Sequence, residues 1–160
     1  DALDAGKQAL TNTWGPFDFE GRDYKFDMTN YYESEMGTPL YRRLVSFEHL
    51  LPPTELTDMK LRCNEIEDAL AHDGKRIVNL DAGYLDHNKV VLASAKARGQ
   101  KIYLDKGIYA DLVGFYKHGR YQPFDWTFPD FTDGRYDQEL LAIRQIYLRQ
   151  RREWRIQNQL

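Results

Sequence analysis

Apolar and polar residues alternate strictly along two short stretches near the start of the chain, at 17–20 and at 24–28. Strict alternation is typical of a half-buried strand, so these stretches form either one hairpin or one long bent strand. Residues 1–13 have the pattern of a helix, which Gly15 and Pro16 would end. A polar and aromatic loop over 29–39 follows, and alternation over 40–47 predicts a further strand.

Helical periodicity replaces this alternation in the middle of the chain. A helix that opens at Thr54 and ends by Gly74 carries an apolar stripe at steps of three and four residues. Residues 76–81 predict a strand, and Asp86 can cap a helix that runs to about Ala97. The stripe consists of Leu56, Met59, Cys63, Ile66 and Leu70.

The last third of the chain returns to strands before a final helix. Residues 101–104 and 108–116 predict two strands that a short loop with Gly107 joins. His118 and Gly119 make a second turn. An aromatic loop covers 123–132, and a long C-terminal helix is expected over 135–157.

This order of elements indicates an α+β fold with a mostly antiparallel sheet and helices packed on it. We expect a single domain over residues 1–160, with the sheet and two helices between residues 17 and 131. With one strand restored in front of residue 1, the first eighty or so residues follow the ferredoxin-like split βαβ order. The sequence therefore predicts a ferredoxin-like core that lacks its first strand.

Composition narrows the class of protein only a little. The 160 residues are 42% hydrophobic and 29% charged, which is ordinary for a globular domain. A net charge of −3 disfavours a dedicated nucleic-acid binder. Cys63 is the single cysteine, so no internal disulfide forms and a reducing cytoplasm is expected. No apolar run has the length of a membrane span, and no pattern indicates an oligomeric state.

The sequence lacks the motifs of the commonest catalytic and binding sites. Neither G-x-x-x-x-G-K-[ST] nor G-x-G-x-x-G occurs, so both standard phosphate-binding loops are absent. The histidines lie far apart along the chain, so neither a zinc site nor another cofactor is expected. They are His49, His72, His87 and His118.

Two polar segments are the first candidates for a binding site. Tyr31, Tyr32 and Glu35 lie in the loop after the first strands, and loops between rigid elements often carry function. Asn79 and Asp81 share one face of a predicted strand, because side chains alternate there. The alternative for the loop is an ordinary surface loop with half-buried tyrosine rings.

The predicted helix after Asp86 could hold an anion. Lys89 would lie one turn inside its N-terminus, where helices favour anions, and Lys96 would lie on the same face. Gly83 would allow the tight turn before it, next to Tyr84. The alternative is that Asp86 only caps the helix and that the lysines are solvated.

Two further segments could contribute. Lys101 and Tyr103 share one strand face, as a polar floor or as a guard of an edge strand. The aromatic residues between Phe124 and Phe131 form either a lid over the core or an exposed binding surface. The arginines near residue 150 suit a solvated helix end.

Long phrases in these same regions are similar to a known bacterial family. The chain resembles the family catalogued as domain of unknown function 4416 over roughly residues 5–150. The matching phrases are residues 26–37, 44–48, 79–84, 89–93, 102–104, 106–110 and 126–130, together with Lys60, Asn64 and Lys96.

The resemblance implies no established activity. Members usually open with an extra β-strand, which agrees with the strand expected before residue 1. They usually have proline where this chain has Ala82, so the turn there is looser here. Members are sometimes labelled GTP-binding proteins, but Asn88 and Lys89 are not followed by the aspartate of a guanine-reading N-K-x-D motif.

Two hypotheses follow from these segments. In the first, the protein binds a small phosphorylated or nucleotide-like ligand, with Glu35 or Asp81 as a candidate general base. In the second, it is a non-catalytic interaction module that uses the aromatic segment from Trp126 to Phe131. The expected ligand-binding residues are Tyr31, Tyr32, Asn79, Tyr84, Lys89, Lys96 and Lys101.

Overall fold

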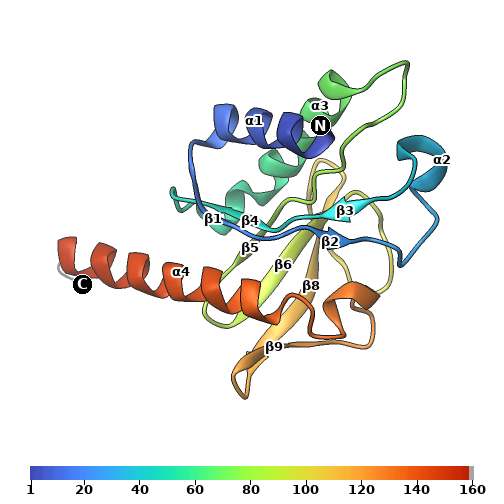
Figure 1. The fold of residues 1–160 in the computed structure, drawn as a ribbon. Helices are drawn as coiled ribbons and strands as arrows, with labels where there is room; N and C mark the ends of the chain where they lie inside the picture. Colours follow the sequence, from blue (N-terminus) through green and yellow to red (C-terminus); the bar gives the residue numbers. More distant parts are fainter. Residues whose placement is uncertain (159–160) are drawn as a thin grey trace.

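The predicted first helix is present as α1, Ala2–Trp14, in a computed structural model that describes residues 1–158 (Figure 1). Asp1 and Asp4 form a capping box, in which each side chain accepts a hydrogen bond from the other's backbone N–H. Gly15, with a φ of 86°, ends the helix and donates its N–H to Thr11. The prediction for residues 1–13 is therefore confirmed.

The first strands form a narrow antiparallel ribbon. β1, Phe17–Glu20, pairs with β4, Val45–Phe47, and β2, Tyr24–Lys25, pairs with β3, Tyr41–Arg42. Because β1 and β2 pair with different partners and not with each other, they behave as one long bent strand. The predicted loop between β2 and β3 contains the short helix α2, Glu33–Met36.

The second predicted helix begins slightly later than its sequence pattern suggests. A single 3₁₀ turn, η1 Pro53–Glu55, precedes α3, Leu56–Leu70, and no side chain caps α3. Thr54, where the sequence pattern opens the helix, therefore lies inside the 3₁₀ turn and not in α3. Helices α1 and α3 pack against each other on one side of the sheet (Figure 1).

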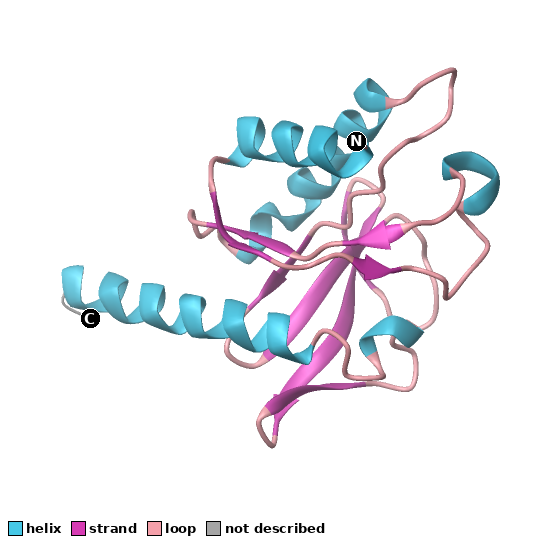
Figure 2. Ribbon diagram, viewed as in Figure 1, coloured by secondary structure: helices cyan, strands magenta, loops and turns pink. Residues whose placement is uncertain are grey.

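A five-stranded antiparallel sheet forms the other half of the molecule (Figure 2). Its order is β5-β6-β8-β7, and β9 pairs with the later part of the long strand β8. Both predicted hairpins are confirmed, since β7 and β9 each pair with β8. The strands are β5 Gly83–Leu85, β6 Lys89–Ser94, β7 Ile102–Asp105, β8 Ile108–Lys117 and β9 Arg120–Pro123.

The helix predicted from Asp86 to about Ala97 is wrong, because this stretch contains β6. Val90 and Val91 are buried on opposite faces of the sheet, in two separate hydrophobic clusters. A central strand buried on both faces has a continuous apolar run, which periodicity does not distinguish from a buried helix. Asp86 caps a hairpin turn instead: its carboxylate accepts the backbone N–H groups of Asn88 and Lys89.

The strand predicted over 76–81 is also wrong, since these residues pair with no neighbouring strand. The side chains of Val78 and Leu80 are nevertheless buried, as the apolar pattern requires. Gly83 does not form the predicted turn into a helix but lies in β5. A Cβ atom there would come within 2.6 Å of the Val91 carbonyl oxygen, so only glycine fits.

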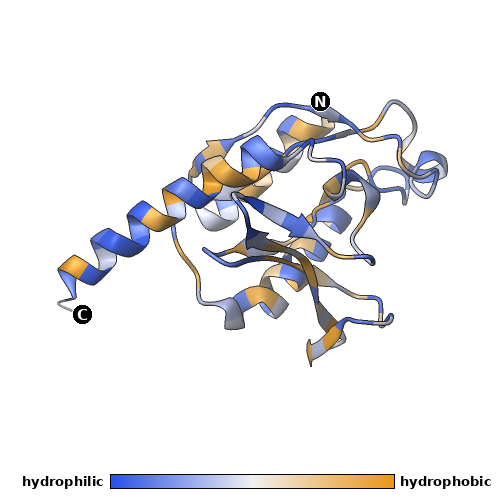
Figure 3. Cartoon of the chain, turned by 90° about the horizontal axis from the view of Figure 1, so that it is seen from below, coloured by the Kyte–Doolittle hydropathy of each residue, from blue (hydrophilic) through white to orange (hydrophobic). Residues whose placement is uncertain are grey.

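Helix α4, Asp137–Gln157, confirms the predicted C-terminal helix. It covers the sheet face opposite α3, where Leu140 packs with Val113, Tyr121 and Tyr136. Its last turns extend beyond the rest of the molecule (Figure 3). Within residues 1–158, no helix combines the length and the apolar character that a bilayer crossing requires.

The predicted α+β class is confirmed, with antiparallel strands and helices packed on them. The order helix, strand pair, helix that a split βαβ core requires is present in α1, the β1–β4 ribbon and α3. A complete ferredoxin-like sheet is not present among residues 1–158, because the segment after α3 has no strand beside it.

Candidate functional site

The loop of residues 29–39, called the Tyr31 loop below, lies against the C-terminal end of β6. Lys96 Nζ lies 4.4 Å from the centroid of the Tyr31 ring, which is a cation–π distance. The Tyr32 ring packs edge-on against Tyr31, with the centroids 4.9 Å apart. Tyr31 is 60% exposed, whereas Tyr32 is half-buried. The first predicted segment and Lys96 therefore meet at one place on the surface.

Lys101 joins them through a shared serine. Its Nζ donates to Ser94 Oγ at 2.9 Å, and the backbone N–H of Lys96 donates to the same oxygen at 3.1 Å. Within the described residues, neither the Lys96 nor the Lys101 ammonium group forms an ion pair with a carboxylate. The ammonium group of Lys101 therefore contacts the hydroxyl group, whereas that of Lys96 lies over the Tyr31 ring.

Arg76 holds Glu35 beneath this loop. Its guanidinium donates to both carboxylate oxygens, with Nε 2.9 Å and Nη2 2.8 Å from them, and its backbone N–H donates as well. The hydrogen bonds from Arg76 lower the pKa of Glu35 to about 2. The carboxylate of Glu35 is therefore ionised, and both of its oxygens accept hydrogen bonds from Arg76. Because its pKa is low it is a weak base, so it is unsuited to general base catalysis.

Arg76 also connects the loop to the second predicted segment. Its Nη1 donates to Asn79 Oδ1 at 3.1 Å, and Asn79 Nδ2 donates to Asp81 Oδ1 at 3.0 Å. Arg42 Nη2 lies 3.3 Å from the second oxygen of Asp81. Asn79 and Asp81 thus share one face, as the sequence pattern predicts, although their segment belongs to no sheet.

Arg42 carries the network into the core. It forms an ion pair with Asp130, which is completely buried and also accepts a hydrogen bond from Tyr136 Oη at 2.7 Å. Burial, together with the bond to Asp130, raises the pKa of Tyr136, which keeps its hydroxyl group a donor. The other oxygen of Asp130 is buried and has no hydrogen-bond partner among the described residues. The guanidinium group of Arg42 is therefore the main group that compensates the negative charge of Asp130.

A large cavity lies on the core side of this cluster. Its volume is about 1030 Å³, and Tyr32, Arg42, Asn79 and Asp81 contribute to its wall. The Tyr31 loop and the segment around Asn79 therefore border one cavity. Most of the wall is apolar, and the cavity opens to solvent.

One of the predicted ligand-binding residues, Lys89, lies elsewhere. It is at the opposite end of β6, where its Nζ donates to Asp86 at 2.6 Å. Burial opposes ionisation of Asp86, but hydrogen bonds from Lys89 and from two backbone N–H groups outweigh it and lower its pKa. Tyr84 packs against the hydrophobic core formed with α3 and contributes to the wall of the cavity.

The aromatic segment is anchored on the sheet and is also partly exposed. Trp126 Nε1 donates to the Leu112 carbonyl at 2.8 Å, which fixes the segment on β8 as a cover of the sheet. Trp126 and Phe128 are nevertheless 45% and 49% exposed. Phe128 also stacks on Phe26, which precedes the Tyr31 loop, with the centroids 6.4 Å apart. The two predicted surfaces are therefore neighbours.

Sequence reasoning missed four residues of this cluster: Arg42, Arg76, Ser94 and Asp130. Arg76 follows a helix and Arg42 lies within a strand, where charged residues are usually solvated. The one signal was Asp130, which stands among four aromatic residues between 124 and 131. A carboxylate in such a segment requires a buried cation, and no sequence pattern says which arginine supplies it.

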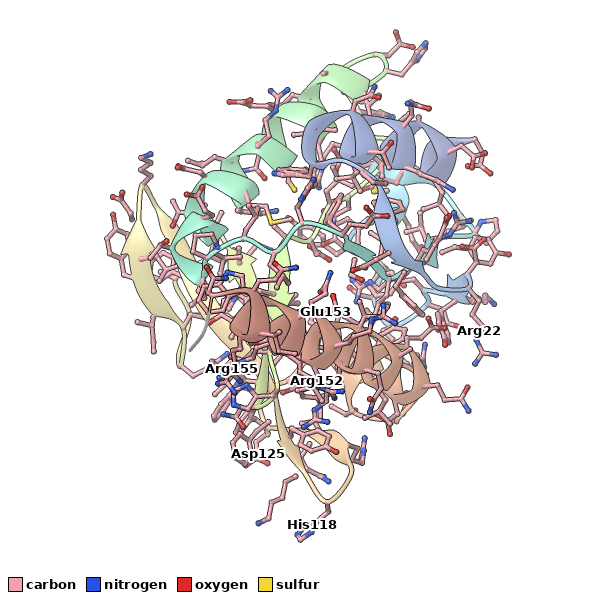
Figure 4. The ribbon with its side chains drawn as sticks, turned by 90° about the vertical axis from the view of Figure 1, so that its left-hand side faces the viewer. Arg22, His118, Asp125, Arg152, Glu153 and Arg155 are labelled. Carbon is pink, nitrogen blue, oxygen red and sulfur yellow. The ribbon has the colours of Figure 1, made fainter. Side chains whose placement is uncertain are left out.

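Other titratable residues are not gathered into a second site. Within residues 1–158, no three His, Cys, Asp or Glu side chains are placed to hold a metal ion. Cys63 is buried on α3, and burial raises its pKa to about 11, so its thiol is unreactive. His118 lies at the exposed tip of the β8–β9 hairpin, and Arg152 and Arg155 project from α4 (Figure 4).

Comparison with known proteins gives one match. A family model described as Domain of unknown function (DUF4416) matches residues 1–147. No curated protein and no solved structure matches the chain.

Proposed function

The chain belongs to the DUF4416 family, and we propose from its own residues that it binds a small phosphorylated or nucleotide-like ligand at the C-terminal end of β6. The observation that carries this proposal is the pair of ammonium groups of Lys96 and Lys101. Neither has a carboxylate partner among the described residues. That of Lys101 lies 2.9 Å from Ser94 Oγ, and that of Lys96 lies over the exposed ring of Tyr31.

Each group has a distinct role in this proposal. Lys96 and Lys101 donate charge-assisted hydrogen bonds to the oxygens of a phosphate, which are stronger than bonds between neutral groups. Ser94 Oγ becomes a further donor when the anion takes over Lys101. Tyr31 offers a ring face for a planar base or a sugar, since its side chain is 60% exposed.

The remaining polar residues position this site. Arg76, held by Glu35, orients Asn79, and Asn79 orients Asp81. Asp81 lies beside Arg42 at the edge of the cavity and can accept hydrogen bonds from ligand hydroxyl or amino groups. Because Glu35 is locked by Arg76, the proposal is for binding and assigns no acid–base step.

A thermal-shift screen followed by calorimetry tests this function. Inorganic pyrophosphate, sugar phosphates and nucleoside mono-, di- and triphosphates are the probes, because they separate the anion from the ring and the sugar. We expect at least one phosphate-bearing probe to raise the melting temperature. Lys96→Ala should abolish this rise, whereas the matched control Lys89→Ala should preserve it. Equal effects of the two substitutions would count against this site.

A second candidate is an interaction surface over Trp126 and Phe128. Its basis is that both rings are about half exposed although side chains of the segment donate hydrogen bonds to backbone carbonyls of β8. Exposed aromatic residues on a rigid segment are typical of interface cores. Pull-down from native lysate with the wild type and a Phe128→Ser variant tests it. A partner that both proteins retain equally would refute this surface.

A further inference from the structure

A pair of tyrosine rings lies on β8 and β7, the strands that follow β6 in the sheet. Tyr103 of β7 and Tyr109 of β8 are cross-strand partners, and their rings pack edge to face with the centroids 5.3 Å apart. Tyr103 is 56% exposed. Among the described residues, neither tyrosine belongs to the two hydrophobic clusters of the core. Packing of the core therefore does not account for these rings.

The register of the strands places both rings on the same face as Ser94. Ser94 pairs with Tyr109, which pairs with Tyr103, and directly opposed residues direct their side chains to one face of a sheet. Lys101 lies two residues before Tyr103, and the bond from its Nζ to Ser94 Oγ places its ammonium group on this face as well. Neighbouring strands lie about 4.8 Å apart, so roughly 10 Å separate the backbones of Ser94 and Tyr103.

This face of the sheet is open to solvent where the rings lie. Ile108 and Ala110 pack in the cluster with α3, so Tyr109, which lies between them on β8, is directed to the opposite face. Helix α4 packs on that opposite face around Val113, in the part of the sheet that contains β9, and leaves Tyr103 exposed. A flat ligand can therefore reach the Tyr103 ring from solvent.

The two lysines of the proposed site thus adjoin two aromatic surfaces. Tyr31 lies under the ammonium group of Lys96. Tyr103 packs on Tyr109 and shares its face of the strand with Lys101. Each surface therefore has its own ammonium group, and the two surfaces come from different parts of the chain. A mononucleotide has one ring system and would occupy only one of them.

We propose that the ligand is a dinucleotide, in which one phosphodiester group joins two nucleosides. Binding of such a ligand rests on the proposed function, since Lys96 and Lys101 hold its phosphate. One base stacks on Tyr31 and the other on Tyr103, and stacking on an aromatic ring accepts any base. A free dinucleotide fits better than a longer strand, because the chain has a net charge of −3 and the site offers two ammonium groups.

Isothermal titration calorimetry with two phosphodiesters tests this proposal. The probes are two adenosines joined by one phosphodiester and the methyl ester of adenosine monophosphate, which carry the same charge and differ in the second nucleoside. Stacking of one more base should make the Kd of the dinucleotide about 5- to 100-fold lower. Equal Kd values for the two probes would overturn the dinucleotide and leave the proposed function intact, whereas no binding of any phosphate-bearing probe would overturn both.

Variants of β7 assign the second base to one ring. Tyr103→Ala should raise the Kd of the dinucleotide to that of the methyl ester and leave the Kd of the methyl ester unchanged. Tyr103→Phe keeps the ring and should keep the gain. The matched control is Ile102→Ala, because Ile102 is the neighbouring residue, is 69% exposed and lies on the opposite face of the strand. A gain that survives Tyr103→Ala, or that Ile102→Ala removes as well, would overturn the proposal.

A single-stranded decanucleotide distinguishes a free dinucleotide from a segment of nucleic acid. Because the site offers two ammonium groups, the decanucleotide should bind no more than about tenfold more tightly than the dinucleotide. A larger gain that falls steeply with salt would contradict the assignment to a free dinucleotide and would assign the surface to single-stranded nucleic acid.

Discussion

The two ends of β6 present one lysine each, and their surroundings differ in kind. Lys89 begins the strand and is neutralised by Asp86, whose carboxylate also closes the hairpin turn. Lys96 lies two residues beyond Ser94, the last residue of the strand, where it rests on Tyr31 without a carboxylate partner among residues 1–158. A charge that already has a partner stabilises local structure, whereas a charge without one is available for a ligand.

Both ends of β6 gather side chains from distant parts of the chain, but these side chains serve different contacts. At the Lys89 end they hold the hairpin turn: Tyr121 Oη donates to the Asp86 carbonyl at 2.6 Å, and Arg144 Nε donates to the His87 carbonyl at 3.3 Å. Around Lys96 they connect the Tyr31 loop, the segment of Asn79 and Asp81, and, through Arg42, the buried Asp130. The ends therefore differ in whether their lysine already has a carboxylate partner. The following substitutions test this contrast.

The largest expected effect is on stability at the Lys96 end. Arg42→Met leaves the buried Asp130 carboxylate without its cation, which should lower the free energy of unfolding by about 3–5 kcal/mol. Urea denaturation measures this loss. The control, Arg22→Met, removes a mostly exposed cation and should cost under about 1 kcal/mol. Similar costs for the two would show that Asp130 does not depend on Arg42.

The next effect is on ligand binding. Lys96→Ala removes one charge-assisted hydrogen bond worth about 1.5–3 kcal/mol, so the Kd for a phosphate-bearing ligand should rise about 10- to 100-fold. Lys89→Ala should change it less than about twofold. Isothermal titration calorimetry with the best ligand of the screen makes the comparison. The contrast between the two ends fails if Lys89→Ala weakens binding as much as Lys96→Ala.

A reciprocal substitution addresses the Lys89 end. Asp86→Ala removes the acceptor for two backbone N–H groups and for Lys89 Nζ, which should lower the free energy of unfolding by about 1–2 kcal/mol. Binding of a phosphate-bearing ligand should be unaffected, because the turn is remote from Tyr31. Urea denaturation and calorimetry on the same sample give both values, and a loss of affinity would contradict the separation.

Tyr31 contributes a smaller amount to binding. Tyr31→Ala removes the ring on which Lys96 rests, and an exposed cation–π contact is worth about 0.5–1 kcal/mol. The Kd should therefore rise about two- to fivefold. Tyr31→Phe keeps the ring and should bind as the wild type does. If Tyr31→Phe and Tyr31→Ala raise the Kd equally, the ligand contacts the hydroxyl group and not the ring face.

The smallest effect is a dependence of stability on pH. The pKa of Glu35 is about 2 in the folded chain, below its ordinary value near 4.5. The ion pair with Arg76 is therefore fully present above pH 4.5, and its contribution is lost as the pH falls towards 2. Glu35→Gln should reduce the loss in the free energy of unfolding between pH 5 and pH 2, measured by urea denaturation. If this loss is unchanged in the variant, another carboxylate causes it.

Local signals were sufficient for much of the fold. The stop at Gly15 and Pro16, the apolar stripe of α3 and the Gly107 hairpin each depend on neighbouring residues, and the structure has all three. The run from Val90 to Ala93 was misassigned as a helix, because its burial on both faces comes from α3 and α4, which lie elsewhere in the chain.

Part of the candidate site is also predictable from local signals. Tyr31, Asn79 and Lys96 were identified from polar residues at loops and element ends, but Lys96 was placed beside Lys89 through the mistaken helix. A strand carries residues 89 and 96 to opposite ends, whereas a helix would stack them on one face. The ion pair of Arg42 with Asp130 joins residues far apart in sequence, so only the fold defines it.

The most direct test of the site is a titration followed by ¹⁵N–¹H correlation spectra of the wild-type chain. Inorganic pyrophosphate and a nucleoside triphosphate are added in separate series. The account predicts saturable shifts at the amides of Tyr31, Asn79, Ser94, Lys96 and Lys101, and none at Asp86 or Lys89. Shifts concentrated at Asp86 and Lys89, or no saturable shift up to millimolar ligand, would contradict it.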